Sequence, residues 1–121
     1  MADQSPVTIV VNTGIVANAI LPVFKVPTGF GGITILQAQV STLTAGTMGL
    51  YLVDAGSAGT STTGGTLATR GGTAHTAKTP IAMTVASSPY LAEGSYLGIK
   101  EDNTGTTVTV TEVAITYRFG K

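Results

Sequence analysis

The feature that most constrains this chain is the alternation of side chains in its last stretch, residues 108–119. From residue 113 on, the large apolar residues occupy odd positions: Val113, Ile115, Tyr117 and Phe119. A period of two is that of a strand with one buried face, so Ile115 and Tyr117 are predicted to point into a core. Just upstream, Val108 and Val110 place the apolar set on even positions. The change of phase at Thr111–Glu112 predicts a β-bulge or bend, with a strand that leaves one sheet partner and joins another.

Runs of β-branched and aromatic residues, separated by Gly, Pro, Asn and Asp, recur along the rest of the chain without a helical period. They predict eight strands, at about Val7–Val11, Ile15–Phe24, Ile33–Val40, Thr47–Val53, Thr66–Arg70, Pro80–Ala86, Tyr96–Glu101 and Thr107–Phe119. Short strands joined by turns are typical of an all-β fold. Eight of them with long connections indicate an antiparallel two-sheet β-sandwich, and more narrowly a jelly roll.

The segments between these strands predict turns and one long polar loop. In "VPTGFGG" (26–32), Pro27 fixes φ and the glycines permit positive φ at Gly29, Gly31 or Gly32. Residues 54–80 contain one large apolar side chain, Leu67, and are predicted to be mostly loop around one short strand.

Length and composition bound the domain organisation. The 121 residues suit one domain, expected over residues 13–121, preceded by an arm at residues 1–12 that orders only against a neighbour. Charged residues make up only 10% of the chain, whereas they make up about 25% of a typical soluble domain. The formal net charge is zero. Near-zero net charge favours association. We therefore expect a surface partly covered by copies of the chain or by a larger partner.

Several classes of protein are disfavoured by what the chain lacks. It has no cysteine, and "MADQSPV" has neither the basic nor the apolar region of a secretory signal. The longest apolar stretch, "GIVANAILPVF", is interrupted by Asn18 and Pro22, so no membrane-spanning helix is expected. Zero net charge leaves no basic footprint for nucleic acid.

No motif predicts a catalytic, cofactor or metal site. His75 is the single histidine, and no G-x-S-x-G sequence accompanies it, so a solvated loop residue is expected. Glu101, Asp102 and Asn103 cluster oxygen atoms without the spacing of a calcium loop, which favours an ordinary polar turn over a weak calcium site. "GFGGIT" (29–34) has no lysine and no following helix, so it is a turn and not a phosphate loop. An enzyme is not expected.

The tyrosines leave a binding alternative open. Tyr51, Tyr90, Tyr96 and Tyr117 could stack on sugar rings, as in lectin-like modules. The favoured interpretation is that each buries its ring and exposes its hydroxyl, because the four lie on several predicted strands and no tryptophan is present.

Three segments carry a resemblance to a known family: "GITILQAQVSTLTAGTMGLYLVDAG" (32–56), "MTVASSPYLAEGSYLGIKEDNTG" (83–105) and "VTVTEVAITYRFGK" (108–121). Together they resemble jelly-roll capsid decoration (cement) proteins of tailed bacteriophages. The resemblance implies a structural virion protein, made in the host cytoplasm, on the outer surface of the capsid. Its implied partners are neighbouring major capsid protein subunits and copies of itself, most often as a homotrimer. The alternative is a carbohydrate- or receptor-binding jelly-roll module of a phage fibre or tail.

The partner contacts are expected in the polar segment 54–80 and in the arm. Neither can add much to a core, and long loops in compact domains are usually functional. Arg70, His75 and Lys78 carry the charge and hydrogen-bonding groups of that segment. These side chains are therefore predicted to contact the shell or sister subunits.

Overall fold

The computed structural model describes residues 6–12, 20–42, 44, 46–60, 64–102 and 110–121. These residues form strands and no helix, so the described part of the chain has no helical segment that could cross a membrane. The strands are β1 (Val7–Asn12), β2 (Ile20–Lys25), β3 (Ile33–Thr42), β4 (Gly46–Asp54), β5 (Thr66–His75), β6 (Ile81–Ala82), β7 (Thr84–Val85), β8 (Tyr90–Leu91), β9 (Tyr96–Asp102) and β10 (Val110–Phe119).

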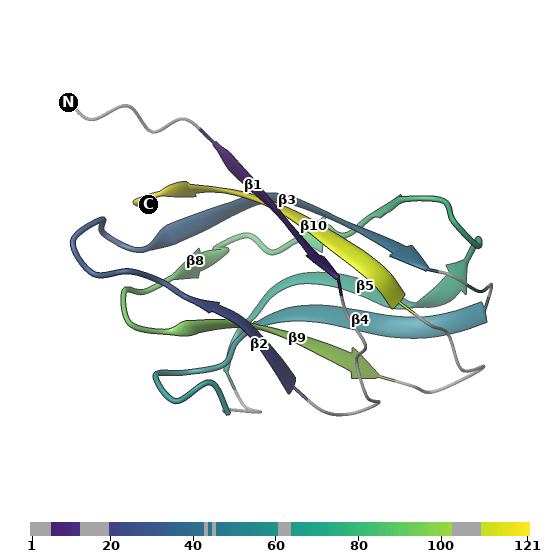
Figure 1. The fold of residues 1–121 in the computed structure, drawn as a ribbon, viewed down its shortest axis with the longest axis horizontal. Helices are drawn as coiled ribbons and strands as arrows, with labels where there is room; N and C mark the ends of the chain where they lie inside the picture. Colours follow the sequence, from purple (N-terminus) through teal and green to yellow (C-terminus); the bar gives the residue numbers. More distant parts are fainter. Residues whose placement is uncertain (1–5, 13–19, 43, 45, 61–63, 103–109) are drawn as a thin grey trace.

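The strands form two antiparallel sheets of five strands each that face one another (Figure 1). The first sheet has the order β1-β10-β3-β6, with β8 pairing the other end of β3. The second has the order β2-β9-β4-β5-β7. The predicted all-β, antiparallel two-sheet sandwich is confirmed, and the narrower jelly-roll connectivity stays a prediction.

The chain moves repeatedly between the two sheets. Strands β4 and β5 form a hairpin within the second sheet, whereas every other pair of successive described strands has one member in each sheet. Each sheet is therefore assembled from segments far apart in the sequence.

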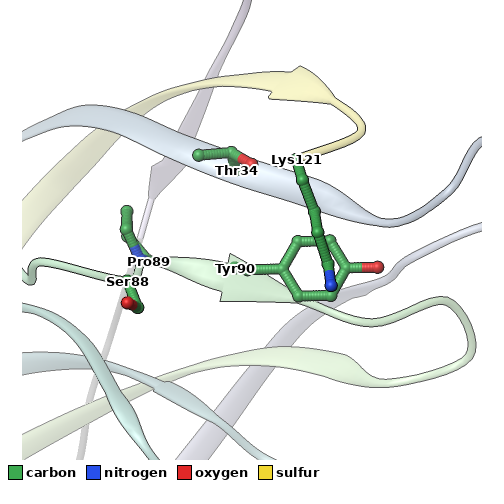
Figure 2. Close-up of a pocket in the computed structure, with 5 residues that line it drawn as sticks. All are labelled: Thr34, Ser88, Pro89, Tyr90 and Lys121. Carbon is green, nitrogen blue, oxygen red and sulfur yellow. The ribbon is translucent and has the colours of Figure 1, made fainter.

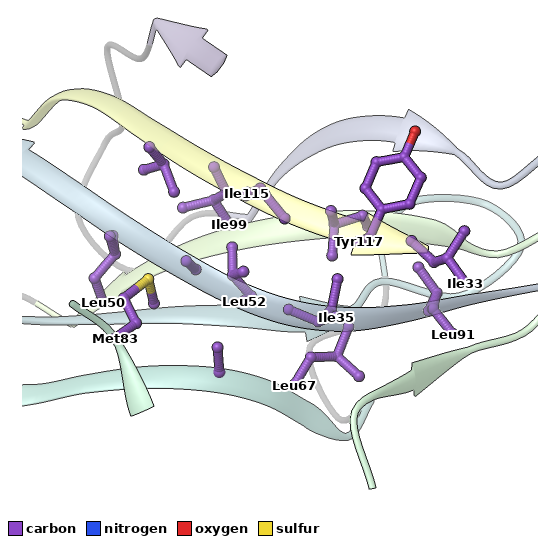
Figure 3. Close-up of a cluster of buried hydrophobic side chains, with 14 of the residues drawn as sticks. Ile33, Ile35, Leu50, Leu52, Leu67, Met83, Leu91, Ile99, Ile115 and Tyr117 are labelled. Carbon is purple, nitrogen blue, oxygen red and sulfur yellow. The ribbon is translucent and has the colours of Figure 1, made fainter. Parts of the chain in front are cut away.

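The core lies between the sheets and is made almost wholly of aliphatic side chains (Figure 3). Its largest fully buried members are Val26, Ile33, Ile35, Val40, Leu50, Leu52, Leu91, Leu97, Ile99, Val113 and Ile115. Burial of each such side chain contributes roughly 1.5–3 kcal/mol. Ile115 is fully buried and Tyr117 is 7% exposed, which confirms the predicted inward face of the last strand.

The predicted bulge in the last strand is also confirmed. Val110 faces Thr42 and Glu112 faces Ser41, so Thr111 is an extra residue on the β10 side of the ladder. Strand β10 pairs with β3 on both sides of this irregularity, so the predicted change of sheet partner was wrong within the described residues.

A second irregularity, which the sequence analysis did not anticipate, shifts the phase of β3. Gln37 faces Thr116 and Ile35 faces Tyr117, so Leu36 is the extra residue. Ile33 and Ile35 are buried before it, and Ala38 and Val40 after it. The shift leaves Leu36 on the outside, 38% exposed.

Three segments differ from their expected form. Strand β5 runs for ten residues to His75, so the short strand predicted to end at Arg70 was wrong in its length. It lies between β4 and β7, and its backbone ladder supports strand conformation without large side chains. The segment expected as one strand at 80–86 is two short strands on different sheets, and Tyr90–Leu91 forms the unpredicted β8. The strand predicted at Val7–Val11 is confirmed as β1, which pairs with β10, and the arm expected over residues 1–12 stays a prediction.

Candidate interaction surfaces

One end of the sandwich holds a turn organised around a single carboxylate. Glu93 Oε2 accepts hydrogen bonds from the backbone N–H groups of Gly29, Phe30 and Gly31, at 2.5, 2.8 and 2.9 Å. Gly29 and Gly31 have φ values of 97° and 77°, so the glycine turn predicted at 26–32 is confirmed. Left-handed conformations at alternating positions turn successive N–H groups toward one point, which makes a nest for an anion. The N–H groups of Gly31, Gly29 and Phe30 hold the pKa of Glu93 below its usual value.

This turn presents an aromatic side chain to solvent. Phe30 is 56% exposed, and its ring centroid lies 4.7 Å from that of Phe119. Phe119 in turn meets Tyr117 edge to face, at 5.7 Å between centroids. The exposed ring is thus connected by packing to the core, on a loop that Glu93 fixes.

A shallow depression of about 490 Å³ opens beside this turn (Figure 2). Its lining residues are Thr34, Ser88, Pro89, Tyr90 and Lys121. The Lys121 ammonium nitrogen lies 4.9 Å from the centre of the Tyr90 ring, and the Tyr90 hydroxyl donates a hydrogen bond to the Gly31 carbonyl at 2.8 Å. The hydroxyls and the Lys121 ammonium suit hydrogen bonding to a polar ligand, and the edge of the Tyr90 ring offers an apolar contact. The lining contains no His, Cys, Asp or Glu side chain.

The described residues contain no group of three or more His, Cys, Asp or Glu side chains that could hold a metal ion. Strand β9 ends at Asp102 after Glu101, while Asn103 of the oxygen cluster considered above lies outside the described residues. The weak calcium alternative therefore gains no support from the described part of the chain.

The outward side of the first sheet is uncharged in its middle, between Glu112 and Arg118 of β10, which alternate with the buried Val113 and Tyr117. We call it the outer face, and its members are Thr8, Val10, Leu36, Gln37, Gln39, Ala82, Ala114 and Thr116. Two rows of cross-strand neighbours run over it. One row places Thr8 beside Thr116, with 2.9 Å between the two hydroxyl oxygens, and Thr116 beside Gln37. The other row runs from Val10 through Ala114 and Gln39 to Ala82. Such a face can make dry or amide-mediated contacts with little desolvation of charge.

The three residues predicted to contact partners lie in strand β5 or just after it. Arg70 is in β5, facing Leu50 of β4, and is half-buried with its Nε atom shielded from solvent. His75 ends β5 opposite Gly46, and its side chain is not among those described. Lys78 is exposed, with a φ of 59°, and its N–H donates to the Thr42 carbonyl at 2.7 Å. His75 and Lys78 therefore lie at the end of the sandwich where β3 passes to β4, and Arg70 lies further along β5.

The tyrosines do not gather on one surface. Tyr51, Tyr90, Tyr96 and Tyr117 lie on β4, β8, β9 and β10, and among them Tyr90 alone lines the depression. Glu93 and Phe30 were missed by the sequence analysis, because their contacts join residues about sixty positions apart. The closely spaced glycines of the 26–32 turn were the available signal, since such turns aim N–H groups at an acceptor.

No protein-family model, no curated protein and no solved structure matches this chain.

Proposed function

We propose that this chain is a structural virion protein that decorates and stabilises the outer surface of a bacteriophage capsid by binding neighbouring major capsid protein subunits. The observation that carries the proposal is the outer face, which spans β1, β10, β3 and β6 and is uncharged between Glu112 and Arg118. A broad surface with charges only at its two ends suits contact with a large protein lattice better than capture of a small substrate. The resemblance of residues 32–56, 83–105 and 108–121 to decoration proteins supplies the identity of the lattice.

The mechanism would be thermodynamic linkage. A protein that binds only the assembled shell stabilises that shell by mass action, in proportion to its occupancy. A rigid sandwich with an aliphatic core serves this purpose, because it loses little conformational entropy when it docks.

The experiment that tests this proposal is co-sedimentation with purified capsids of the virus whose genome encodes the chain. The double variant Gln37→Glu/Gln39→Glu places two charges on the outer face and should lower occupancy about tenfold or more, because each charge would have to be desolvated or repelled. The variant Lys78→Gln tests the separate contact predicted for the 54–80 segment. Both changes are at exposed side chains, so the melting temperature should hardly move.

Wild-type protein that fails to bind capsids would overturn the proposal. If both variants bound capsids with the same occupancy as wild type, neither the outer face nor Lys78 would be the contact. Arg70 is unsuitable for this test, because its buried Nε makes any replacement a change in the packing of β5 as well.

A second candidate, a carbohydrate-binding module, is favoured by the depression beside Tyr90. It offers the Tyr90 ring, the hydroxyls of Thr34, Ser88 and Tyr90, and the Lys121 ammonium within one hollow. A glycan array that gives specific binding, abolished by Tyr90→Ala, together with no capsid binding, would favour this candidate over the first.

A further inference from the structure

The four lateral edges of the two sheets are not equally protected against pairing with other strands. In the described part of the chain, β1 and the short β6 and β8 bound the first sheet, and β2 and β7 bound the second. An open strand edge is a row of unpaired N–H and C=O groups, which another strand can use as a template. Proteins block such edges with short strands, proline, lysine or bulges.

Three of these edges carry such protection. Strands β6, β7 and β8 have two residues each, too few for a stable ladder. Strand β2 contains Pro22, which has no N–H, and Lys25, and its pairing with β9 is irregular between Pro22 and Phe24. These edges are unsuited to pairing with another chain.

Strand β1 has none of these devices. Its sequence, VTIVVN, contains no charge, proline or glycine. It pairs with β10 over all six residues in an unbroken register, so its other edge is straight. Val10 is 56% exposed on the outer face, and Ile9 and Val11 are only partly buried against the core.

We propose that β1 is a self-association edge, on which a second copy of this chain docks its own β1 in antiparallel orientation. Antiparallel pairing of identical strands satisfies a two-fold axis, so each copy presents the same surface to the other. A register that pairs odd residues with odd residues continues both the inward and the outward rows of side chains across the contact. Zero net charge and the absence of charge on β1 remove the repulsion that would oppose two like copies.

A second copy fits this edge better than a foreign strand does. The partly buried Ile9 and Val11 of one copy would be extended by the same aliphatic row of the other, which lengthens the core across the contact. The proposal goes beyond the proposed function, because it names a surface for the self-association that the low charge of the chain led us to expect. It predicts a pair of copies, whereas the resemblance to decoration proteins implies three.

The test measures the mass of the purified protein over a range of concentrations by light scattering or native mass spectrometry, without capsids. Wild type should be a dimer. Val10→Lys should raise the dissociation constant about tenfold or more, because like charges then face each other across the contact. Gln39→Lys adds the same charge to the same face on an interior strand, so it should leave the dimer unchanged.

A mixture of Val10→Lys with Val10→Glu should recover dimers that neither variant forms alone, a result that damage to folding could not produce. In this cysteine-free chain, Val10→Cys should oxidise to a covalent dimer, while Gln39→Cys should not.

A wild-type monomer or trimer, a dimer that survives Val10→Lys, or a Gln39→Lys monomer would each overturn the assignment. Capsid binding is not a readout of this test, so its outcome is independent of the proposed function.

Discussion

The hydroxyl of Tyr90 donates a hydrogen bond to the carbonyl of Gly31, and this contact lies directly against the α-carbon of Gly32. Gly32 has a φ of 83°, and a β-carbon there would meet the Leu91 carbonyl oxygen at 2.6 Å and also the Tyr90 hydroxyl. Strand β8 can therefore approach the turn only because residue 32 has no side chain.

Gly32→Ala is accordingly expected to destabilise the fold by about 2–5 kcal/mol, from the left-handed backbone and from the displaced neighbours together. Gly29→Ala is the matched control. It has a φ of 97° but open space around the new β-carbon, so its cost should be about 1–2 kcal/mol. Chemical denaturation of both variants gives the difference, and equal costs would contradict the steric account.

Glu93→Gln tests the carboxylate that organises the 26–32 turn. The pKa of Glu93 is lowered by the N–H groups of Gly31, Gly29 and Phe30, so the folded state favours the ionised form. Its contribution to stability is therefore full above the unfolded value of about 4.3 and is lost as pH falls through the lower folded pKa. The variant should melt below wild type at pH 7, and the gap should close in strong acid.

Glu112→Gln is the control for loss of one exposed carboxylate outside the turn. A gap between wild type and Glu93→Gln that persists unchanged to low pH would mean that the side chain acts through packing and not through its charge.

Ile115→Ala should cost about 2–5 kcal/mol, because it removes a fully buried side chain from the middle of the core and leaves a cavity. Leu36→Ala removes a side chain of similar size that is 38% exposed on the outer face, and should cost about 1 kcal/mol or less. Urea titrations of the two variants provide the comparison. If Leu36→Ala proved the more costly, the inward and outward faces of the first sheet would be wrongly assigned.

Tyr117→Phe probes the desolvated phenol beside Phe24, whose ring centroid is 5.5 Å away. Burial raises the pKa of Tyr117 above its usual value, so the unfolded chain ionises first as pH rises. Stability should therefore fall above about pH 10 in wild type, and less steeply in Tyr117→Phe. Thermal melts from pH 8 to 11 measure this, and parallel curves for the two proteins would argue against the desolvation.

The parts of the fold that were predictable from sequence are those with strong local signals. The alternation of apolar residues predicted which side chains of β10 point inward and where the strand has a bulge, near Thr111. The spacing of the glycines predicted the turn at 26–32. The strand predicted at Thr66–Arg70 was too short, because residues 71–75 contain no large apolar side chain. Pairing with β4 extends β5 to His75 all the same. The Leu36 bulge was missed because its phase change is visible only once the register with β10 is known.

The candidate surfaces were less accessible to sequence reasoning. The outer face combines four strands whose order cannot be deduced from their own residues, and Glu93 reaches its turn across more than sixty positions. Arg70, His75 and Lys78 remain predicted contacts, chosen for their charge and hydrogen-bonding groups within a segment that was expected to be loop.

The pairing of β1 with β10 has a consequence for synthesis on the ribosome. Val7 faces Tyr117 and Asn12 faces Glu112, so the first described strand finds its partner only after about 100 further residues have been added. At about 5–20 residues per second, β1 waits roughly 5–20 s in the nascent chain with both of its edges open. Nascent chains on neighbouring ribosomes can meet during that interval. Chaperone shielding of residues 7–12 should therefore affect the yield of native protein more than shielding of any later strand.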